Sequence, residues 1–125
     1  MPRAKQLTVQ LANKPGTLAQ VAQSLGKAKV NMRALAVFEG RAKIIADDPA
    51  KGREALQKEG LYASIEDCLA VDMSDQPGSL GEICARLTNA GINIDYAYTG
   101  ITQTPGKAVV VMVESDLDKA AKIAG

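Results

Sequence analysis

The residues best suited to chemistry in this chain stand in two Pro-Gly turns, each followed by a helical pattern. The turn "NKPGTL" returns as "DQPGSL" 62 residues later. The first N–H groups of a helix have no partner within it and lie at the positive end of its dipole, so such a turn can hold a carboxylate or another small anion. Alternatively, Thr17 or Ser79 caps the helix, with Gln20 or Glu82 completing a capping box. Spacing alone leaves both interpretations open.

One asparagine follows each turn at the same distance. Asn31 and Asn93 each lie between two apolar residues, where a strand is expected to begin. A side-chain amide offers both a donor and an acceptor and could hold an ammonium or a carboxylate. Because the intervening helix runs back over the sheet, the asparagine lies far from the turn of its own unit. It is therefore either a structural cap of the preceding helix or a contact to a neighbouring unit.

Other chemistries find little support in the composition. The chain has no His, which excludes the common nucleophile–base pairs, and it has no glycine-rich phosphate loop. Cys68 and Cys84 lack metal-binding spacing and are predicted to be small core residues in a reducing compartment. The acidic pair Asp47-Asp48 lies at the expected start of a helix, where an Asp is better explained as a helix cap than as part of a catalytic pair. We expect no enzymatic activity, no cofactor and no metal site.

The two turns belong to a longer internal repeat. Residues 13–32 and 75–94 align without a gap, with six identical positions and mostly conservative changes elsewhere. A repeated turn with repeated apolar spacing indicates one supersecondary unit used twice, and we predict two domains, 1–66 and 67–125. Units this small bury only about 60% of their unfolded surface. We therefore expect a homo-oligomer, at least a dimer.

Alternating and helical patterns give the order of elements in each unit. The runs 6–11 and 68–73 alternate as half-buried strands, and the turns lead into helices. Second strands follow to about Phe38 and Thr99, and third strands at 42–47 and 108–114. Second helices lie at 47–60, with Asp48 as cap and Pro49 at the first position, and at 115–125. Residues 61–65 can form a fourth strand of the first unit.

This order of elements predicts a fold class. Strand, helix, strand, strand, helix, strand, with the helices on one face of an antiparallel sheet, is the ferredoxin-like α+β arrangement. The second unit reaches Gly125 just after its second helix, so its last strand is missing or is supplied from elsewhere. The run 109–113 is apolar at every position, which predicts that both faces of its sheet are covered.

Charge and composition exclude further classes. The net charge is only +1, but the chain to Tyr62 carries +6 and the rest carries −5. With 3% aromatic residues the chain lacks the stacking side chains of nucleic-acid binding proteins, so we interpret the asymmetry as complementarity between units or chains. There is no apolar run of about 20 residues and no signal-peptide pattern at the start. A cytoplasmic protein without membrane contact is the expectation.

Both copies of the repeat resemble ACT domains, a small-molecule regulatory module. The resemblance rests on the motif [N/D]-x-P-G-[S/T/V]-L, followed about fifteen residues later by [V/I]-N-[I/M], and it covers nearly the whole chain. It implies paired βαββαβ units with an amino-acid effector held where two units meet. It also implies which residues bind: Asn13, Gly16, Thr17, Leu18, Asn31 and Met32 in the first copy, and Asp75, Gly78, Ser79, Leu80, Asn93 and Ile94 in the second.

The resemblance leads to a hypothesis about function. No catalytic or DNA-binding domain accompanies the two units, so we expect a non-enzymatic sensor of a free amino acid that acts on a separate metabolic enzyme. The alternative is an assembly module that pairs with a partner enzyme without any ligand. Asp75 replaces the Asn of the first turn and should attract a ligand's ammonium, so the two sites are not expected to be equivalent. The sequence does not indicate which amino acid binds.

Overall fold

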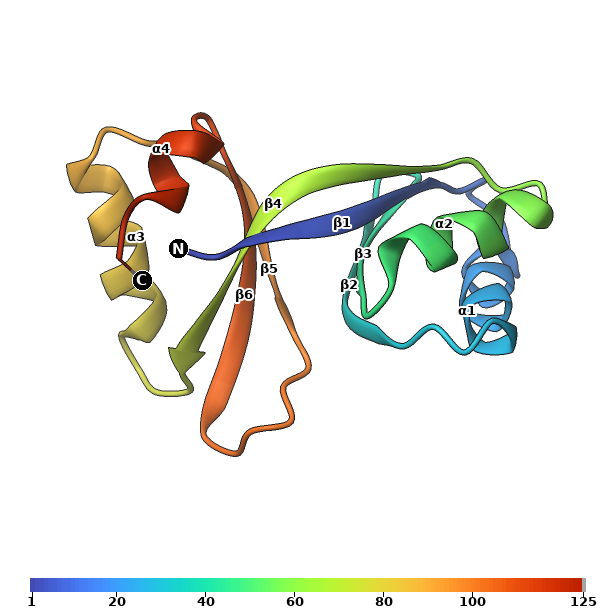
Figure 1. Ribbon diagram of the computed structural model, residues 1–125, viewed down its shortest axis with the longest axis horizontal. Helices are drawn as coiled ribbons and strands as arrows, with labels where there is room; N and C mark the ends of the chain where they lie inside the picture. Colours follow the sequence, from blue (N-terminus) through green and yellow to red (C-terminus); the bar gives the residue numbers. More distant parts are fainter. Residues whose placement is uncertain (125) are drawn as a thin grey trace. The chain divides into compact units, whose positions relative to one another are not determined.

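The computed structural model describes residues 1–124 and divides the chain into two compact units (Figure 1). The N-terminal unit is Lys5–Glu66, and the C-terminal unit is Met1–Ala4 together with the chain from Asp67 onward. The elements are β1 (Arg3–Gln10), α1 (Thr17–Lys27), β2 (Met32–Phe38), β3 (Arg41–Ala46), α2 (Pro49–Lys58), β4 (Ala63–Ser74), α3 (Ser79–Asn89), β5 (Ile94–Gly100), β6 (Lys107–Glu114) and α4 (Leu117–Ala121). Two ferredoxin-like units are confirmed. The ACT domain limits 1–66 and 67–125 stay a prediction.

The N-terminal unit is an antiparallel sheet with α1 and α2 on one face (Figure 1). β3 pairs with β1 on one side and with β2 on the other, and the Gln10 N–H donates to the Tyr62 carbonyl at 3.2 Å on the outer side of β1. The helices and strands share one core because their apolar positions recur with helical and alternating periods. Its fully buried members include Leu7, Val9, Val21, Leu25, Ile44 and Leu56.

Helix α2 begins as predicted. The Asp48 carboxylate accepts a bond from the Lys51 N–H at 3.1 Å, and Pro49 occupies the first helical position. Gly52 lies inside this helix and is buried; a Cβ built there would lie 3.0 Å from Leu7 Cδ1. The absence of a side chain at Gly52 therefore lets α2 pack closely on β1.

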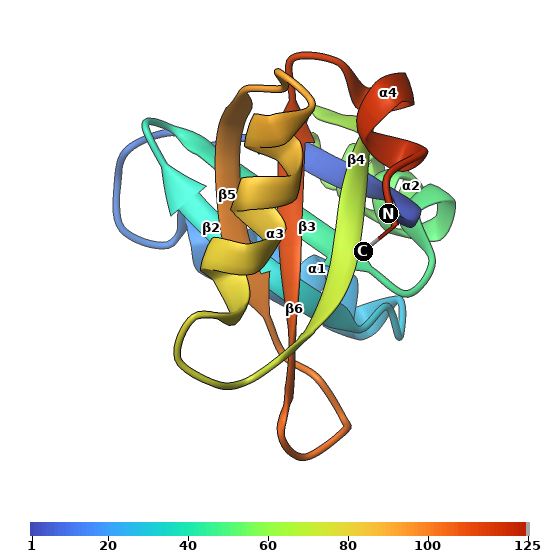
Figure 2. The ribbon, with the colours of Figure 1, turned by 90° about the vertical axis from the view of Figure 1, so that its left-hand side faces the viewer.

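The C-terminal unit repeats this plan with β4, β6 and β5, and with α3 lying across these strands (Figure 2). Its core contains Leu69, Val71, Leu87, Val110 and Met112. Val111, on the face away from the helices, is also fully buried, whereas Val109 and Val113 on that face are half-buried, so full coverage of both faces stays a prediction.

The missing last strand of the C-terminal unit is supplied by the start of the chain. Ala70 donates its N–H to the Pro2 carbonyl at 3.0 Å, and the Met1 side chain is part of the core. The Met1 ammonium donates to the carbonyls of Ala121, at 3.0 Å, and Ile123. Within residues 1–124 no strand follows α4. Of the two alternatives that the sequence left open, supply from elsewhere holds.

Three sequence expectations differ in detail from the structure. Residues 61–65 and 68–73 were expected as two strands, but β4 is continuous from Ala63 to Ser74 because no turn residue interrupts it. Cys84 is only half-buried, because the core side of α3 is carried by Ile83 and Leu87, whereas Cys68 is buried as expected. The helix expected at 115–125 spans Leu117–Ala121, and Gly125 lies outside the described residues.

Candidate functional site

The Pro-Gly turns place a glycine, and not Thr17 or Ser79, at the N-cap of their helices. Gly16 has φ 94° and Gly78 has φ 90°, and for neither helix does a side chain accept a bond from the first turn in the described chain. The predicted caps are therefore wrong. Because glycine takes up the left-handed cap position, Thr17 is already the first helical residue. Its hydroxyl points back and donates to the Ala12 carbonyl at 2.9 Å and the Lys14 carbonyl at 3.2 Å.

The predicted capping boxes fail for the same reason. In α1 the Gln20 side chain donates to the Glu59 carbonyl at 3.5 Å instead of reaching back to the cap. The first helical bonds run from the Gln20 N–H to the Gly16 carbonyl, at 3.0 Å, and from the Glu82 N–H to the Gly78 carbonyl, at 3.1 Å. The amides ahead of these two residues are thus the ones that an anion could address.

Both turns present these amides on the protein surface beside an apolar side chain. Gly16 and Gly78 are exposed, and so are Leu18 (37%) and Leu80 (44%). The two turns are not identical, because Ser79 donates its N–H to the Gln76 carbonyl at 3.2 Å. Asn13 and Asp75 are exposed at the matching position before each proline, so the second turn carries a carboxylate where the first carries an amide.

The two asparagines join the second and third strands through their backbones. The Asn31 N–H donates to Asp47 Oδ1 at 3.0 Å, and the Asn31 carbonyl accepts from the Asp47 N–H at 3.0 Å. Asn93 repeats this pair with the Ser115 hydroxyl at 3.0 Å and the Ser115 N–H at 2.9 Å. Both side chains are exposed, while Met32 and Ile94 behind them pack against the cores. The side-chain amides are therefore on the surface, and no described bond makes them caps of the preceding helix.

Within one unit the turn and the asparagine do not meet. They flank an α-helix of 11 residues, which at 1.5 Å per residue separates its ends by about 16 Å. The structure thus groups Asn13, Gly16, Thr17 and Leu18 in one turn and Asp75, Gly78, Ser79 and Leu80 in the other. It keeps Asn31 with Met32, and Asn93 with Ile94, at the opposite helix ends. A site that combines a turn with an asparagine needs two units, and such a site stays a prediction.

A glycine-to-alanine pair tests the role of the first turn. We expect Gly16→Ala to lower the free energy of unfolding by about 1–2 kcal/mol, because a Cβ there meets no atom within 4 Å and only the left-handed backbone is penalised. Gly26→Ala in α1 also meets no atom, but it gains helix propensity and should raise stability by about 0.5–1 kcal/mol. Urea unfolding measures both. Equal stability of the two variants would contradict the assigned backbone strain.

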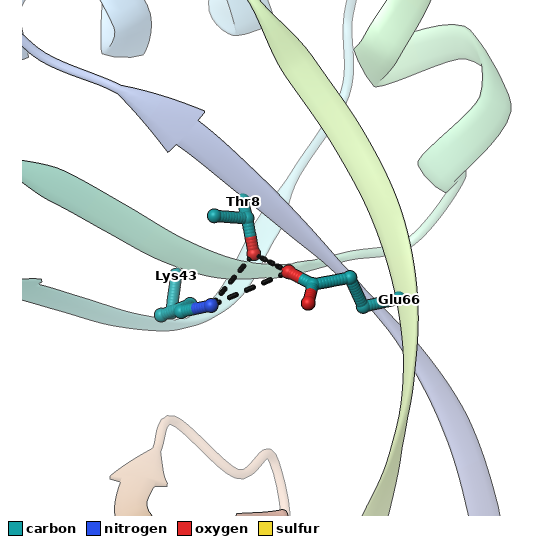
Figure 3. A network of polar contacts seen from close by, with 3 residues as sticks. All are labelled: Thr8, Lys43 and Glu66. Atoms are coloured by element: carbon teal, nitrogen blue, oxygen red, sulfur yellow. Dashed lines mark hydrogen bonds and ion pairs between the residues drawn. The ribbon is translucent and has the colours of Figure 1, made fainter.

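A polar network that the sequence did not reveal lies on the face of the N-terminal sheet away from the helices. Lys43 Nζ donates to Thr8 Oγ1 at 2.9 Å and to Glu66 Oε1 at 3.3 Å, and the Thr8 hydroxyl also donates to Glu66 (Figure 3). The Lys43 side chain is 6% exposed and that of Glu66 is 45% exposed. The Thr8 hydroxyl, and then Lys43, lower the pKa of Glu66 against the opposing effect of burial. A lysine inside an apolar strand was the available signal.

The lowered pKa of Glu66 predicts a pH dependence. A carboxyl whose folded pKa lies below its usual value of 4.5 contributes stability above that value, and this contribution is lost as the pH falls through the folded pKa. We expect Glu66→Gln to cost under about 1 kcal/mol at pH 7, since the side chain is half exposed and screened. Its stability should fall less steeply than that of the parent below pH 4.5 in urea titrations. Parallel curves would contradict this role.

Glu114 was also missed, and it has the opposite electrostatic environment. It is 6% exposed, and neither carboxylate oxygen has a hydrogen-bond partner among the described residues. Burial raises its pKa, and Asp95 adds to the shift. A single acid at the end of an apolar run gives little warning in sequence, because strands often end in polar residues.

A cavity is found in each unit of the described chain. One, of about 340 Å³, lies between α1 and α2 and is lined by none of the predicted site residues. The other, of about 190 Å³, lies between the end of β4 and α3, and Ser79 is the predicted residue that lines it, together with Asp72, Met73, Ser74, Glu82, Ile83 and Arg86.

The described residues include no group of three His, Cys, Asp or Glu that could hold a metal, and no helix among them could cross a membrane.

The repeated turn, the repeated Asn at the second strand and the doubled ferredoxin-like fold agree with the family comparison. The family model described as an ACT domain pair matches residues 3–124, and the chain belongs to this family. Protein BT0572 from Bacteroides thetaiotaomicron is 32% identical in sequence, with a TM-score of 0.86 over 94% of this chain and 83% of that one. A search of curated proteins found no match.

Two further solved structures are similar in fold alone. The regulatory subunit of aspartate kinase from Thermus thermophilus, in its ligand-free form, has a TM-score of 0.68 at 15% identity, over 97% of this chain and 88% of that one. E. coli aspartokinase III in complex with lysine and aspartate has a TM-score of 0.57 at 15% identity, over 98% of this chain and 30% of that one.

Proposed function

We propose that this ACT domain pair is a non-catalytic regulatory protein of the cytoplasm that binds a free amino acid and acts on a separate metabolic enzyme. Family membership supports a regulatory role. Two proteins of similar fold support the ligand class and the kind of partner: one is a regulatory subunit of a kinase, and the other is a kinase in complex with lysine and aspartate. The binding form is a homodimer or a higher oligomer.

The observation that carries this proposal is the uncapped first turn of α1 and α3. A side-chain cap would have used the amides, and the sequence allowed that interpretation, but glycine stands at both cap positions. A ligand carboxylate is suited to these amides by hydrogen bonding and by the helix dipole. The exposed Leu18 and Leu80 beside them would cover the apolar part of the ligand.

The ligand's ammonium would be bound from a second unit. Asn31 or Asn93, at the start of a neighbouring second strand, offers an amide oxygen for it, and Asp75 adds a negative charge at one class of site. Met32 and Ile94 then form part of the apolar wall. This arrangement accounts for the exposure of both asparagine side chains. The bonds to Asp47 and Ser115 at the start of each second strand are made by the backbone of the asparagines and do not use their side chains.

A thermal-shift screen tests the proposal. The twenty amino acids are added one by one, and a binding amino acid at 100 times its dissociation constant should stabilise the protein by about 2.7 kcal/mol. Light scattering at tens of micromolar, with and without that amino acid, measures the oligomer. No response to any of the twenty, together with a stable oligomer, would reject the sensor and leave the ligand-independent assembly module.

A further inference from the structure

Glu114 is an uncompensated carboxyl group at the end of β6. The residue is 6% exposed and both of its oxygens are buried without a hydrogen-bond partner in the described part of the chain. A buried carboxylate in that state is strongly disfavoured, and proteins normally pair it or bind a cation to it. The described residues therefore provide no hydrogen-bond partner or counter-charge for this carboxyl group.

The internal repeat shows that the fold does not require an acid at this position. In the C-terminal unit Glu114 is the register partner of Ile94, and in the N-terminal unit the matching partner of Met32 is Ala46. The residues that follow, Ser115 and Asp47, make the same bonds to the two asparagines. The same strand end thus folds with an alanine in one unit and with a buried acid in the other.

Charged groups of both signs lie on the elements around this end of the C-terminal unit. Strands β4 and β5 flank β6, and α4 packs against it. Asp95 on β5 accepts a bond from Asn93 Nδ2 at 3.1 Å. Lys119 of α4 points elsewhere, since its Nζ donates to the Ala90 carbonyl at 2.7 Å. The other charged groups on these elements include Asp67 on β4, Asp116, which caps α4, and Asp118, which pairs with Arg3; the Met1 ammonium is bound to the carbonyls of Ala121 and Ile123.

We propose that Glu114, Asp95 and Asn93 form a site for a primary ammonium group, and that Glu114 supplies its central negative charge. The inference rests on the proposed function and deepens it, because it assigns the ammonium of the effector to the C-terminal unit. An ammonium has three N–H donors, which suit the two unpaired oxygens of Glu114 and the carboxylate of Asp95. Metal binding is disfavoured, since the described acids do not form a ligand set.

Binding at this site favours the charged form of Glu114. Without a cation, burial raises the pKa of Glu114 and so favours its neutral form. When the ammonium arrives, a protonated Glu114 carboxyl gives its proton to water, and the carboxylate accepts N–H bonds from the ammonium. The side chain has several rotatable bonds and stands at the last position of its strand, so it can turn toward Asn93 at the surface.

A carboxyl titration with methylammonium chloride as the probe tests the site directly. The pKa of Glu114 is followed by carbon NMR in the full chain, with sodium chloride at equal ionic strength as the control. We expect methylammonium, and not sodium chloride, to lower the pKa of Glu114. An equal pKa in both salts would overturn the site.

Substitutions separate this site from the proposed function. Glu114→Gln keeps the shape, and Glu114→Ala copies Ala46, so at least one should fold; Glu54→Gln is the control. For an amino acid found in the thermal screen, both Glu114 variants should bind about ten- to hundred-fold more weakly and release no proton in calorimetry. Unchanged affinity would overturn the site and leave the proposed function standing. A methylammonium response without binding of any amino acid would reject the proposed function and support the site.

Discussion

Leu7→Ala is expected to lower the free energy of unfolding of the N-terminal unit by about 2–5 kcal/mol. Leu7 is fully buried at the centre of its core, where its Cδ1 lies so close to α2 that a Cβ at Gly52 would be 3.0 Å away. The surrounding strands and helix hold this geometry, so the cavity left by the lost methyl groups collapses only in part. In a unit of this size such a loss is a large fraction of the total stability.

Urea unfolding followed by circular dichroism measures the effect. Leu35→Ala is the matched control, because Leu35 is 39% exposed on β2 and its truncation should change stability by less than about 0.5 kcal/mol. If both leucines cost the same, the assignment of the core to the helix-covered face of this unit is wrong.

Asn31→Ala and Asn93→Ala are expected to weaken amino-acid binding by about 1–3 kcal/mol while leaving the fold intact. The bonds of the two asparagines to Asp47 and Ser115 are made by backbone groups, which alanine retains, and their side chains are exposed. The effects should differ in detail, since Asn93→Ala also removes the donor to Asp95. Calorimetric titration with the amino acid from the thermal screen measures the loss.

Asn89→Ala provides the comparison, because Asn89 is an exposed asparagine at the end of α3, outside the proposed site. Its affinity should equal that of the parent protein. Should Asn31→Ala and Asn93→Ala both bind as tightly as the parent, the site between units is wrong and the Pro-Gly turns only start helices.

The sequence by itself determined the fold and the repeat. Alternation in 6–11 and the helical stripe after Gly16 are local patterns, and local patterns fix which face of an element is apolar. The Asp48 cap with Pro49 was predicted for the same reason, since a cap depends on residues within one turn. The residues of the two Pro-Gly turns were found because they occur twice with equal spacing, which chance seldom produces.

Tertiary structure decided the features that depend on distant residues. The last strand of the C-terminal unit comes from Met1–Ala4, which no local pattern near residue 125 could indicate. Thr17 does not cap its helix because the adjacent Gly16 adopts the left-handed conformation at the cap position, and the backbone conformation of the turn became visible only in the structure. The network of Thr8, Lys43 and Glu66 joins three strands, and the unpaired state of Glu114 depends on everything packed around it. Burial and pairing are properties of the assembled core, because they depend on which groups displace water from a side chain.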